Sequence, residues 1–254
     1  MTRGPSGTFN RILDAVQRCS APIWASEGPT ANLSTVDHNG TCGFVDTGSV
    51  RLLLTAWHVV EKFQKMRLGH PATVLAVNLG RGCTIALAEP EIIDSDRSFD
   101  IATIAFPHLS ESAAEHGKAY FPARTWPIPR VKRGDLVAMV GFPGERRHAA
   151  DGWGSFEPVG AGFSVSSASD RNIVLADESG TMETLTSRGA KGGAVRLGGF
   201  SGTPVFLVQP GRPELVGVLR AGSESMGPNA GSTVFLTPTY FLSRDGTFDR
   251  RAMP

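Results

Sequence analysis

The sequence lacks the features that mark secreted, membrane-spanning or nucleic-acid-binding chains. It has three cysteines among 254 residues, an odd number at irregular spacing, so we expect no disulfide framework and predict a cytoplasmic location. No stretch approaches the roughly 20 apolar residues of a membrane-spanning helix, and no signal peptide follows the first residues. Lys plus Arg number 25 against 24 for Asp plus Glu, so no excess charge points to nucleic acid or to an anionic membrane.

The sequence also lacks the paired ligands that protein metal sites use. Cys19, Cys42 and Cys83 are accompanied by no C-x-x-C or H-x-x-x-H pair. We therefore expect neither a bound metal nor a cofactor.

Glycine and proline are abundant instead, and they separate short apolar runs. The 30 glycines and 17 prolines favour strands and turns over long helices. One amphipathic helix is predicted over residues 8–18, because apolar residues from Phe9 to Val16 recur at helical spacing. A helical turn over residues 61–66 and a short terminal helix from residue 240 are also predicted. The predicted strands cover residues 21–33 (with a turn), 41–46, 50–56, 73–79, 83–89, 101–106, 136–141, 163–167, 172–176, 205–208, 215–219 and 234–237.

The strands fall into two groups, which indicates an all-β chain with two antiparallel β-barrels or sandwiches. Residues 108–130 have no clean period and carry three prolines, so we interpret them as the connection between two halves. The predicted division is a helical extension over residues 1–24, a first barrel over residues 25–120 and a second barrel over residues 121–254.

Three residues with useful chemistry stand at the ends of predicted elements. His58 ends a strand, Asp100 opens an apolar strand after a polar loop, and Ser201 lies between glycines just ahead of another strand. A serine hydroxyl becomes a good nucleophile when a base takes its proton, and histidine titrates near neutrality. A carboxylate fixes the histidine tautomer and stabilises the imidazolium. The glycines around the serine let two backbone N–H groups point at one spot, as an oxyanion hole requires.

Each of these residues also has a plainer interpretation. His58 by itself is more often a half-buried histidine with satisfied hydrogen bonds, and a glycine-rich stretch is more often a simple turn. Asp94 and Asp96 lie near Asp100, but they belong to the predicted polar loop, and we expect them to be solvated. Thr203 replaces the last glycine of G-x-S-x-G, which argues against an α/β-hydrolase nucleophile elbow. The other histidines, expected at the surface, are His38, His70, His108, His116 and His148.

The three residues follow one another in the order His, Asp, Ser, which is the order of chymotrypsin-type triads. On these motifs, over roughly residues 25–245, the chain resembles the trypsin-like (chymotrypsin-fold) serine proteases. Within them it is most similar to the bacterial HtrA-like branch, which lacks the usual disulfides. The motifs are Thr55-Ala56-Trp57-His58, Asp100-Ile101-Ala102 and Gly199-Phe200-Ser201-Gly202-Thr203-Pro204.

The resemblance implies two antiparallel six-stranded β-barrels and a serine endopeptidase that cleaves a protein or peptide substrate through an acyl-enzyme. It implies Ser201 as the nucleophile, His58 as the general base and acid, and Asp100 as the carboxylate that orients the histidine. The N–H groups of Gly199 and Ser201 would form the oxyanion hole.

The resemblance also implies a pocket for the side chain that precedes the cleaved bond. None of the implied pocket residues is acidic, so cleavage after Lys or Arg is disfavoured and a small or apolar side chain is expected. Arg196 or Arg220 would favour an acidic side chain, which is the alternative. The strand through Ala221 is expected to bind substrate by β-addition. The implied pocket residues are Val195, Arg196, Arg220, Ala221, Gly222 and Thr233.

The sequence departs from secreted members of the family at several places. Val59 stands where many of them have a cysteine, and Cys42 is placed where the disulfide partner would sit, so a free thiol is expected. Phe200 replaces the aspartate with which secreted zymogens pair a newly cut N-terminus. Activation by cleavage near residue 25 is therefore not expected.

We also expect no PDZ domain after the second barrel, and hence a form of control that differs from that of HtrA proteins. A regulatory protein partner or a narrow substrate range would restrain the enzyme, as in bacterial defence or signalling systems. The alternatives to an active endopeptidase are an inactive protease-like binding module and an esterase that uses the same site.

Overall fold

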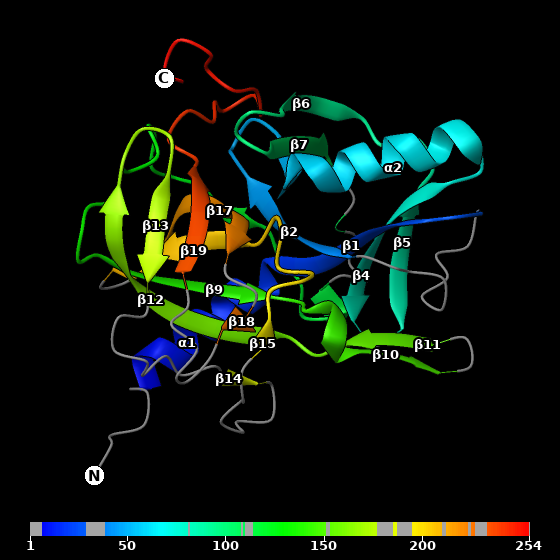
Figure 1. The fold of residues 1–254 in the computed structure, drawn as a ribbon, viewed down its shortest axis with the longest axis horizontal. Coiled ribbons are helices and arrows are strands. Elements are labelled where there is room, and N and C mark those ends of the chain that lie inside the picture. Colours follow the sequence, from blue (N-terminus) through cyan, green and yellow to red (C-terminus); the bar gives the residue numbers. More distant parts are fainter. Residues whose placement is uncertain are drawn as a thin grey trace.

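The computed structural model describes residues 7–28, 39–80, 82–107, 109, 114–150, 153–176, 185–186, 195–209, 212–222, 225–226 and 233–253 (Figure 1). Two large antiparallel sheets lie side by side in it, one formed mainly by the first half of the chain and one by the second. The predicted strands are confirmed to within a few residues, except that residues 29–33 of the first lie outside the described residues.

The first sheet contains β1 (Ser20–Ser26), β2 (Gly40–Asp46), β3 (Arg51–Thr55), β4 (Val74–Gly80), β5 (Cys83–Leu87), β6 (Ile92–Asp96), β7 (Ile101–Ala105) and β8 (Phe121–Pro122). Its order is β5-β4-β1-β2-β3-β7-β6, and β8 is added in parallel beside β2. Seven strands thus form an antiparallel path, rather than the six that the resemblance implied. The additional strand is β6, which pairs with β7 where the sequence predicted a polar loop.

The second sheet contains β9 (Leu136–Gly141), β12 (Val159–Ala168), β13 (Ile173–Ala176), β14 (Leu185–Thr186), β16 (Pro204–Leu207), β17 (Glu214–Gly222) and β19 (Thr233–Pro238). The order β13-β19-β17-β16-β9-β12 is closed by pairing of β12 with β13. This closed ring is the predicted six-stranded antiparallel barrel. Smaller elements are η1 (Gly144–Arg146), the hairpin of β10 (Arg147–Ala150) and β11 (Trp153–Phe156), and the pair of β15 (Val195–Arg196) and β18 (Ser225–Met226).

Apolar side chains fill the interior of each sheet and the contact between the two. Phe44 and Phe106 stack in the first sheet with ring centroids 5.8 Å apart. Val137 and Leu175 are buried in the second barrel. Between the sheets, Phe206 is buried in a third cluster, which holds the two halves together.

The predicted N-terminal helix is confirmed as α1 (Gly7–Arg18). Its buried side chains Ile12, Leu13 and Val16 belong to the cluster between the two sheets. The chain then enters β1 directly at Ser20, before the boundary predicted at residue 25. No helix in the described part of the chain is long and apolar enough to span a membrane.

The second helix, α2 (Trp57–Gly69), is longer than the single turn predicted over residues 61–66. It begins two residues after β3 and buries Val59, Val60 and Phe63. His58 therefore lies in the first turn of a helix and does not end a strand, which corrects the sequence-based expectation.

The predicted short terminal helix from residue 240 is wrong. The chain makes a turn there, in which Leu242 N–H donates to the Thr239 carbonyl at 2.9 Å, and Leu242 then bridges to Phe248 in antiparallel fashion. The physical reason is burial: the reversal packs Phe248 against Phe241 with ring centroids 5.7 Å apart. A helix would carry the chain away from this contact.

The buried thiols of Cys19 and Cys42, together with the half-buried Lys118, predict an unusual dependence of stability on pH. Burial raises the pKa of each thiol from 9.0 to about 12, and burial lowers the pKa of Lys118 from 10.5 to about 8. From pH 8 the unfolded chain keeps the lysine proton that the folded chain has lost, so stability rises. Above pH 9 the unfolded thiols ionise and the folded thiols do not, so stability falls. We expect maximum stability near pH 9.

Equilibrium unfolding in denaturant at pH 8 to 11 measures this profile. Cys19→Ala with Cys42→Ala removes the thiols' part of the loss above pH 9, which is on the order of 1 kcal/mol per pH unit for each thiol. A loss above pH 10 persists in the variant, because burial also raises the pKa values of Tyr120 and Tyr240. Cys83→Ala, at a half-buried position, is the matched control and should leave the profile unchanged. A double variant that loses stability above pH 9 as steeply as the unmodified protein contradicts the prediction.

Candidate active site

Asp100 holds His58 at two points. Its Oδ1 accepts the backbone N–H of His58 at 2.9 Å, and its Oδ2 lies 2.8 Å from His58 Nδ1. The Asp100 side chain is 16% exposed, while that of His58 is 47% exposed. With Nδ1 facing the carboxylate, the other ring nitrogen, Nε2, is left to bind a proton donor.

The backbone around Asp100 is shaped for this contact. Its φ is +52°, in the left-handed region that aspartate tolerates better than most residues. Its N–H donates to the Arg97 carbonyl at 3.3 Å, which closes a turn just before β7. The turn brings the carboxylate to the first turn of α2, and β7 pairs with β3, the strand that precedes that helix.

The two neighbouring aspartates do not compete for the histidine. Asp94 and Asp96 belong to β6, not to a solvated loop, and both form ion pairs with Arg250, at 2.7 and 3.2 Å. Burial opposes ionisation of Asp96, but hydrogen bonds from Ser98 and the Phe99 N–H outweigh it and lower its pKa. These carboxylates tie the end of the chain to the first sheet.

The other histidines divide as follows. His70 and His148 are exposed, as expected, while His116 is half-buried. Nδ1 of His116 is buried and has no hydrogen-bond partner within the described residues. His38 and His108 lie outside the described residues.

Ser201 lies in a loop that we call the serine loop, residues 197–203. The Ser201 carbonyl accepts the Thr41 N–H at 2.8 Å. A Cβ added to Gly202 would come within 2.8 Å of the Ala56 nitrogen, and one added to Gly40 would meet both Val59 and the Ser201 carbonyl. The serine loop therefore packs against the start of α2, the turn of helix that carries His58.

The hydroxyl of Ser201 is half-exposed and makes no hydrogen bond to the described residues. The structure thus joins Asp100 to His58 and places the backbone of the serine loop against the start of α2, while no hydrogen bond joins the Ser201 hydroxyl to His58.

The serine loop begins with a type II β-turn. The Phe200 N–H donates to the Leu197 carbonyl at 2.9 Å, and Gly199, at the third position, has φ +98°. The Gly198 carbonyl accepts the Gly144 N–H at 2.8 Å. Because the C=O and N–H of one peptide point in opposite directions, the Gly199 N–H faces away from Gly144. The N–H groups of Gly199 and Ser201 have no acceptor among the described residues and remain available to an anion.

The predicted pocket residues are only partly brought together. Arg220 is the extra residue of a bulge between β17 and β19, and its guanidinium donates to Asn172 Oδ1 at 2.8 Å. Arg196 is exposed, and its backbone N–H donates to Glu145. The Arg220 side chain therefore has a hydrogen-bond partner, and the Arg196 side chain is exposed to solvent.

Leu197, which was not among the implied pocket residues, lies against the end of β17. Its Cδ1 lies 2.3 Å from the position of a Cβ added to Gly222, and the Thr233 carbonyl lies 3.1 Å from the same position. Ala221 and Gly222 are exposed, while Val195 is in β15, which pairs with β18. Leu197, the first residue of the serine loop, thus lies against Gly222 and the Thr233 carbonyl.

The position opposite Val59 is occupied by Gly40, not by Cys42. A Cβ on Gly40 would lie 2.6 Å from Val59 Cγ2. Cys42 is fully buried, pairs with Ala21 of β1 in the register and belongs to the same apolar cluster as Val59. All three cysteines are free, as expected.

Two polar residues near the serine loop were missed from the sequence. Thr41 and Asn39 lie beside the turn at Gly199, and Asn39 Nδ2 donates to the Phe142 carbonyl at 2.8 Å. Their sequence context indicated a turn before a strand and gave no sign of a contact with residues about 100 and 160 positions further on. The single available signal was the glycine-rich segment 141–144, which accepts such close contacts.

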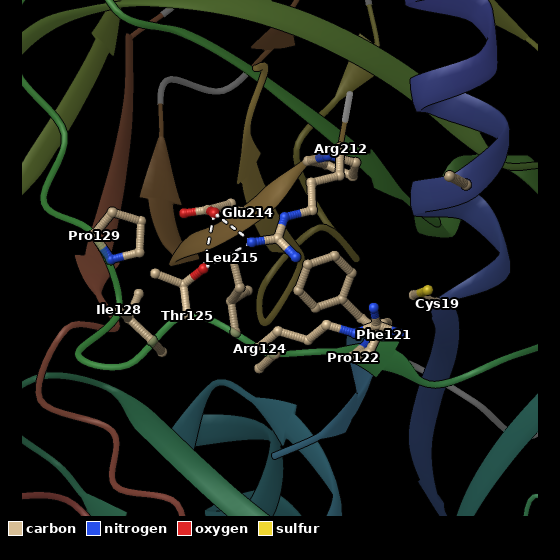
Figure 2. A pocket seen from close by; sticks show the side chains of 13 residues that line it. Cys19, Phe121, Pro122, Arg124, Thr125, Ile128, Pro129, Arg212, Glu214 and Leu215 are labelled. Atoms are coloured by element: carbon tan, nitrogen blue, oxygen red, sulfur yellow. Dashed lines mark hydrogen bonds and ion pairs between the residues drawn. The ribbon is translucent and has the colours of Figure 1, made fainter. Parts of the chain in front are cut away.

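A cavity in the described structure lies elsewhere. It has a volume of about 340 Å³ and is lined by residues of α1, β8 and the start of β17 (Figure 2). Glu214 binds Thr125 at 2.9 Å and Arg212 at 3.5 Å at one side of it. None of His58, Asp100 and Ser201 lines this cavity.

Comparison with known proteins supports the fold. No protein-family model and no curated protein matches the sequence. Among solved structures, the chain is similar to Deg5, with 15% identity, a TM-score of 0.50, and coverage of 93% of this chain and 91% of that one. A thermostable serine protease AL20 from an extremophilic microorganism has 13% identity and a TM-score of 0.48, with 87% of this chain and 91% of that one covered. The architecture is a chymotrypsin-like two-barrel fold, mostly β-strand with two α-helices in the described residues.

Proposed function

We propose that the protein is a serine endopeptidase that uses His58, Asp100 and Ser201 as a catalytic triad. The observation that carries the proposal is the two-point contact of Asp100 with His58 beside the loop of Ser201. Such a contact fixes both the ring orientation and the tautomer of the histidine. The fold provides the same arrangement of elements that trypsin-like proteases use, which supports the proposal at the level of the class.

The reaction would run in two halves. Ser201 Oγ attacks the carbonyl carbon of the scissile peptide while His58 Nε2 takes the hydroxyl proton. The negative oxygen of the tetrahedral intermediate binds the N–H groups of Gly199 and Ser201. His58 then gives its proton to the leaving amine, and an acyl-enzyme remains. Water, deprotonated by His58, releases the acid and restores Ser201.

The proposed preference before the cleaved bond is a small or apolar side chain. The apolar side chain of Leu197 lies against Gly222, which supports this preference. The Arg220 guanidinium already has Asn172 as its partner, which disfavours an acidic side chain there. Arg196 is exposed, and an acidic preference set by it is the alternative that a peptide library distinguishes. The exposed strand at Ala221 and Gly222 offers backbone groups for β-addition of a protein or peptide substrate.

Restraint by a partner protein or by narrow specificity remains part of the proposal, together with a cytoplasmic, bacterial setting. The reason is the type II turn at Gly199, in which the Gly199 N–H already faces away from Gly144. If the oxyanion-binding N–H is already oriented in the resting protein, its proteolytic activity must be restrained by something other than a rearrangement of the serine loop.

A fluorophosphonate probe tests the proposed function. The unmodified protein should be labelled at Ser201 and should cleave peptides of a degenerate library mainly after small or apolar residues. Ser201→Ala should abolish both, since no nucleophile remains. Labelling without peptide cleavage would indicate an esterase or a partner-gated enzyme. No labelling of the unmodified, folded protein would refute the proposal and favour a binding module.

A further inference from the structure

Thr41 is a fully buried threonine at the meeting point of the two sheets, and all of its polar groups are bonded. Its N–H donates to the Ser201 carbonyl and its carbonyl accepts the Thr55 hydroxyl, both at 2.8 Å. Its own hydroxyl donates to the Gly199 carbonyl at 2.8 Å and accepts the Phe142 N–H at 3.2 Å. One side chain therefore joins β2, the end of β9 and the serine loop.

These bonds fix the peptide groups on both sides of Gly199. The preceding peptide is held through the Gly198 carbonyl by the Gly144 N–H, and the following one through the Gly199 carbonyl by the Thr41 hydroxyl. A type II turn becomes a type I turn when its central peptide rotates by about half a turn. That rotation would replace the Gly199 N–H by the Gly198 carbonyl oxygen at the site where an oxyanion would bind.

The space around Gly199 allows little adjustment. A Cβ there would lie 2.5 Å from the Phe142 carbonyl oxygen and 2.8 Å from Asn39 Nδ2. Asn39 in turn donates to the same Phe142 carbonyl. Segment 142–144 is thus tied to Asn39 and Thr41, and it is the segment that holds the Gly198 carbonyl.

We propose that the Thr41 hydroxyl is a positioning group that keeps the Gly198–Gly199 peptide turned so that the Gly199 N–H faces the reacting carbonyl. The inference rests on the proposed function. It explains how the serine loop is ordered when Phe200 stands where secreted zymogens have an aspartate: neutral hydrogen bonds from β2 take the place of an ion pair. The hydroxyl suits this role because it donates and accepts at once.

Thr41→Val tests the role, because it keeps the shape of the side chain and removes the hydroxyl. We expect kcat on a peptide substrate to fall by about 100-fold, the size of effect that loss of one oxyanion-hole donor produces. KM should change less than about threefold, because ground-state binding does not use the oxyanion hole. Thr41→Ser retains the hydroxyl and should recover most of the activity.

Thr103→Val is the matched structural control. Thr103 is also fully buried, and its hydroxyl also bonds to a distant carbonyl, that of Gly246 at 2.7 Å. It should lose a comparable amount of stability and keep kcat. Equal kcat values for Thr41→Val and Thr103→Val would overturn the positioning role, while a fluorophosphonate-inert unmodified protein would refute the proposed function instead.

A crystal structure of Thr41→Val reads the peptide orientation without any need for activity. The expected result is a negative φ at Gly199, or a mixture of the two turn types. A φ that stays near +98° in the variant, with the Gly198 carbonyl still on Gly144, would overturn the inference even if the protein hydrolyses nothing.

Discussion

Replacement of Asp100 by asparagine is expected to lower kcat by about four orders of magnitude while the protein stays folded. Asp100 accepts two N–H groups of His58, one from the backbone and one from Nδ1. An asparagine has one acceptor oxygen and one NH₂ group. If its oxygen keeps the backbone N–H, its NH₂ faces Nδ1, which must then be unprotonated. The proton moves to Nε2, and His58 can no longer accept the proton of Ser201.

The measurement is kcat on the best peptide from the library, with thermal unfolding as the test of folding. Asp94→Asn is the matched control, because Asp94 binds Arg250 rather than the histidine. Its kcat should stay within about twofold of the unmodified value, since its ion pair lies outside the site. An Asp100→Asn variant that retains kcat would show that His58 is oriented by something else, and would count against the triad.

Local patterns were sufficient to predict much of the fold. Apolar spacing located α1, and alternating short runs between glycines located the hairpins of both sheets. The residues His58, Asp100 and Ser201 could be singled out because each stands next to a strongly patterned strand. The expectation that they meet in space rested on a resemblance to a known fold, since nothing within the individual segments relates positions so far apart.

The features that the sequence did not reveal depend on contacts between distant segments. Residues 94–99 were predicted as a polar loop, yet the first three of them belong to β6, because β7 and Arg250 satisfy their polar groups. A helix was predicted from residue 240, but the chain turns there because Phe248 packs on Phe241. The contact between Thr41 and Gly199 spans 158 positions, and no local pattern records it.

Phe200→Ala is the second variant with a large expected effect, because it removes the anchor of the serine loop. The ring is fully buried in the second barrel and lies against Gly141, where a Cβ would come within 2.4 Å of it. Truncation of a buried phenylalanine costs about 3 to 5 kcal/mol of unfolding free energy. Phe200 also lies between Gly199 and Ser201, so we expect kcat of the folded variant to fall by about 100-fold or more, as for a lost oxyanion-hole donor.

Phe206→Ala separates the two effects. Phe206 is 1% exposed and packs on Phe121 with ring centroids 4.7 Å apart, in the cluster between the sheets rather than under the serine loop. Its truncation should cost a similar amount of stability, measured by urea unfolding, yet leave kcat within a few-fold when rates are measured well below the unfolding temperature. Equal losses of kcat in the two variants would mean that activity follows global stability. A loss confined to Phe200→Ala would mean that this buried ring, at the position of a zymogen's aspartate, holds the serine loop in place. It would do so together with the Thr41 hydroxyl, which binds the Gly199 carbonyl.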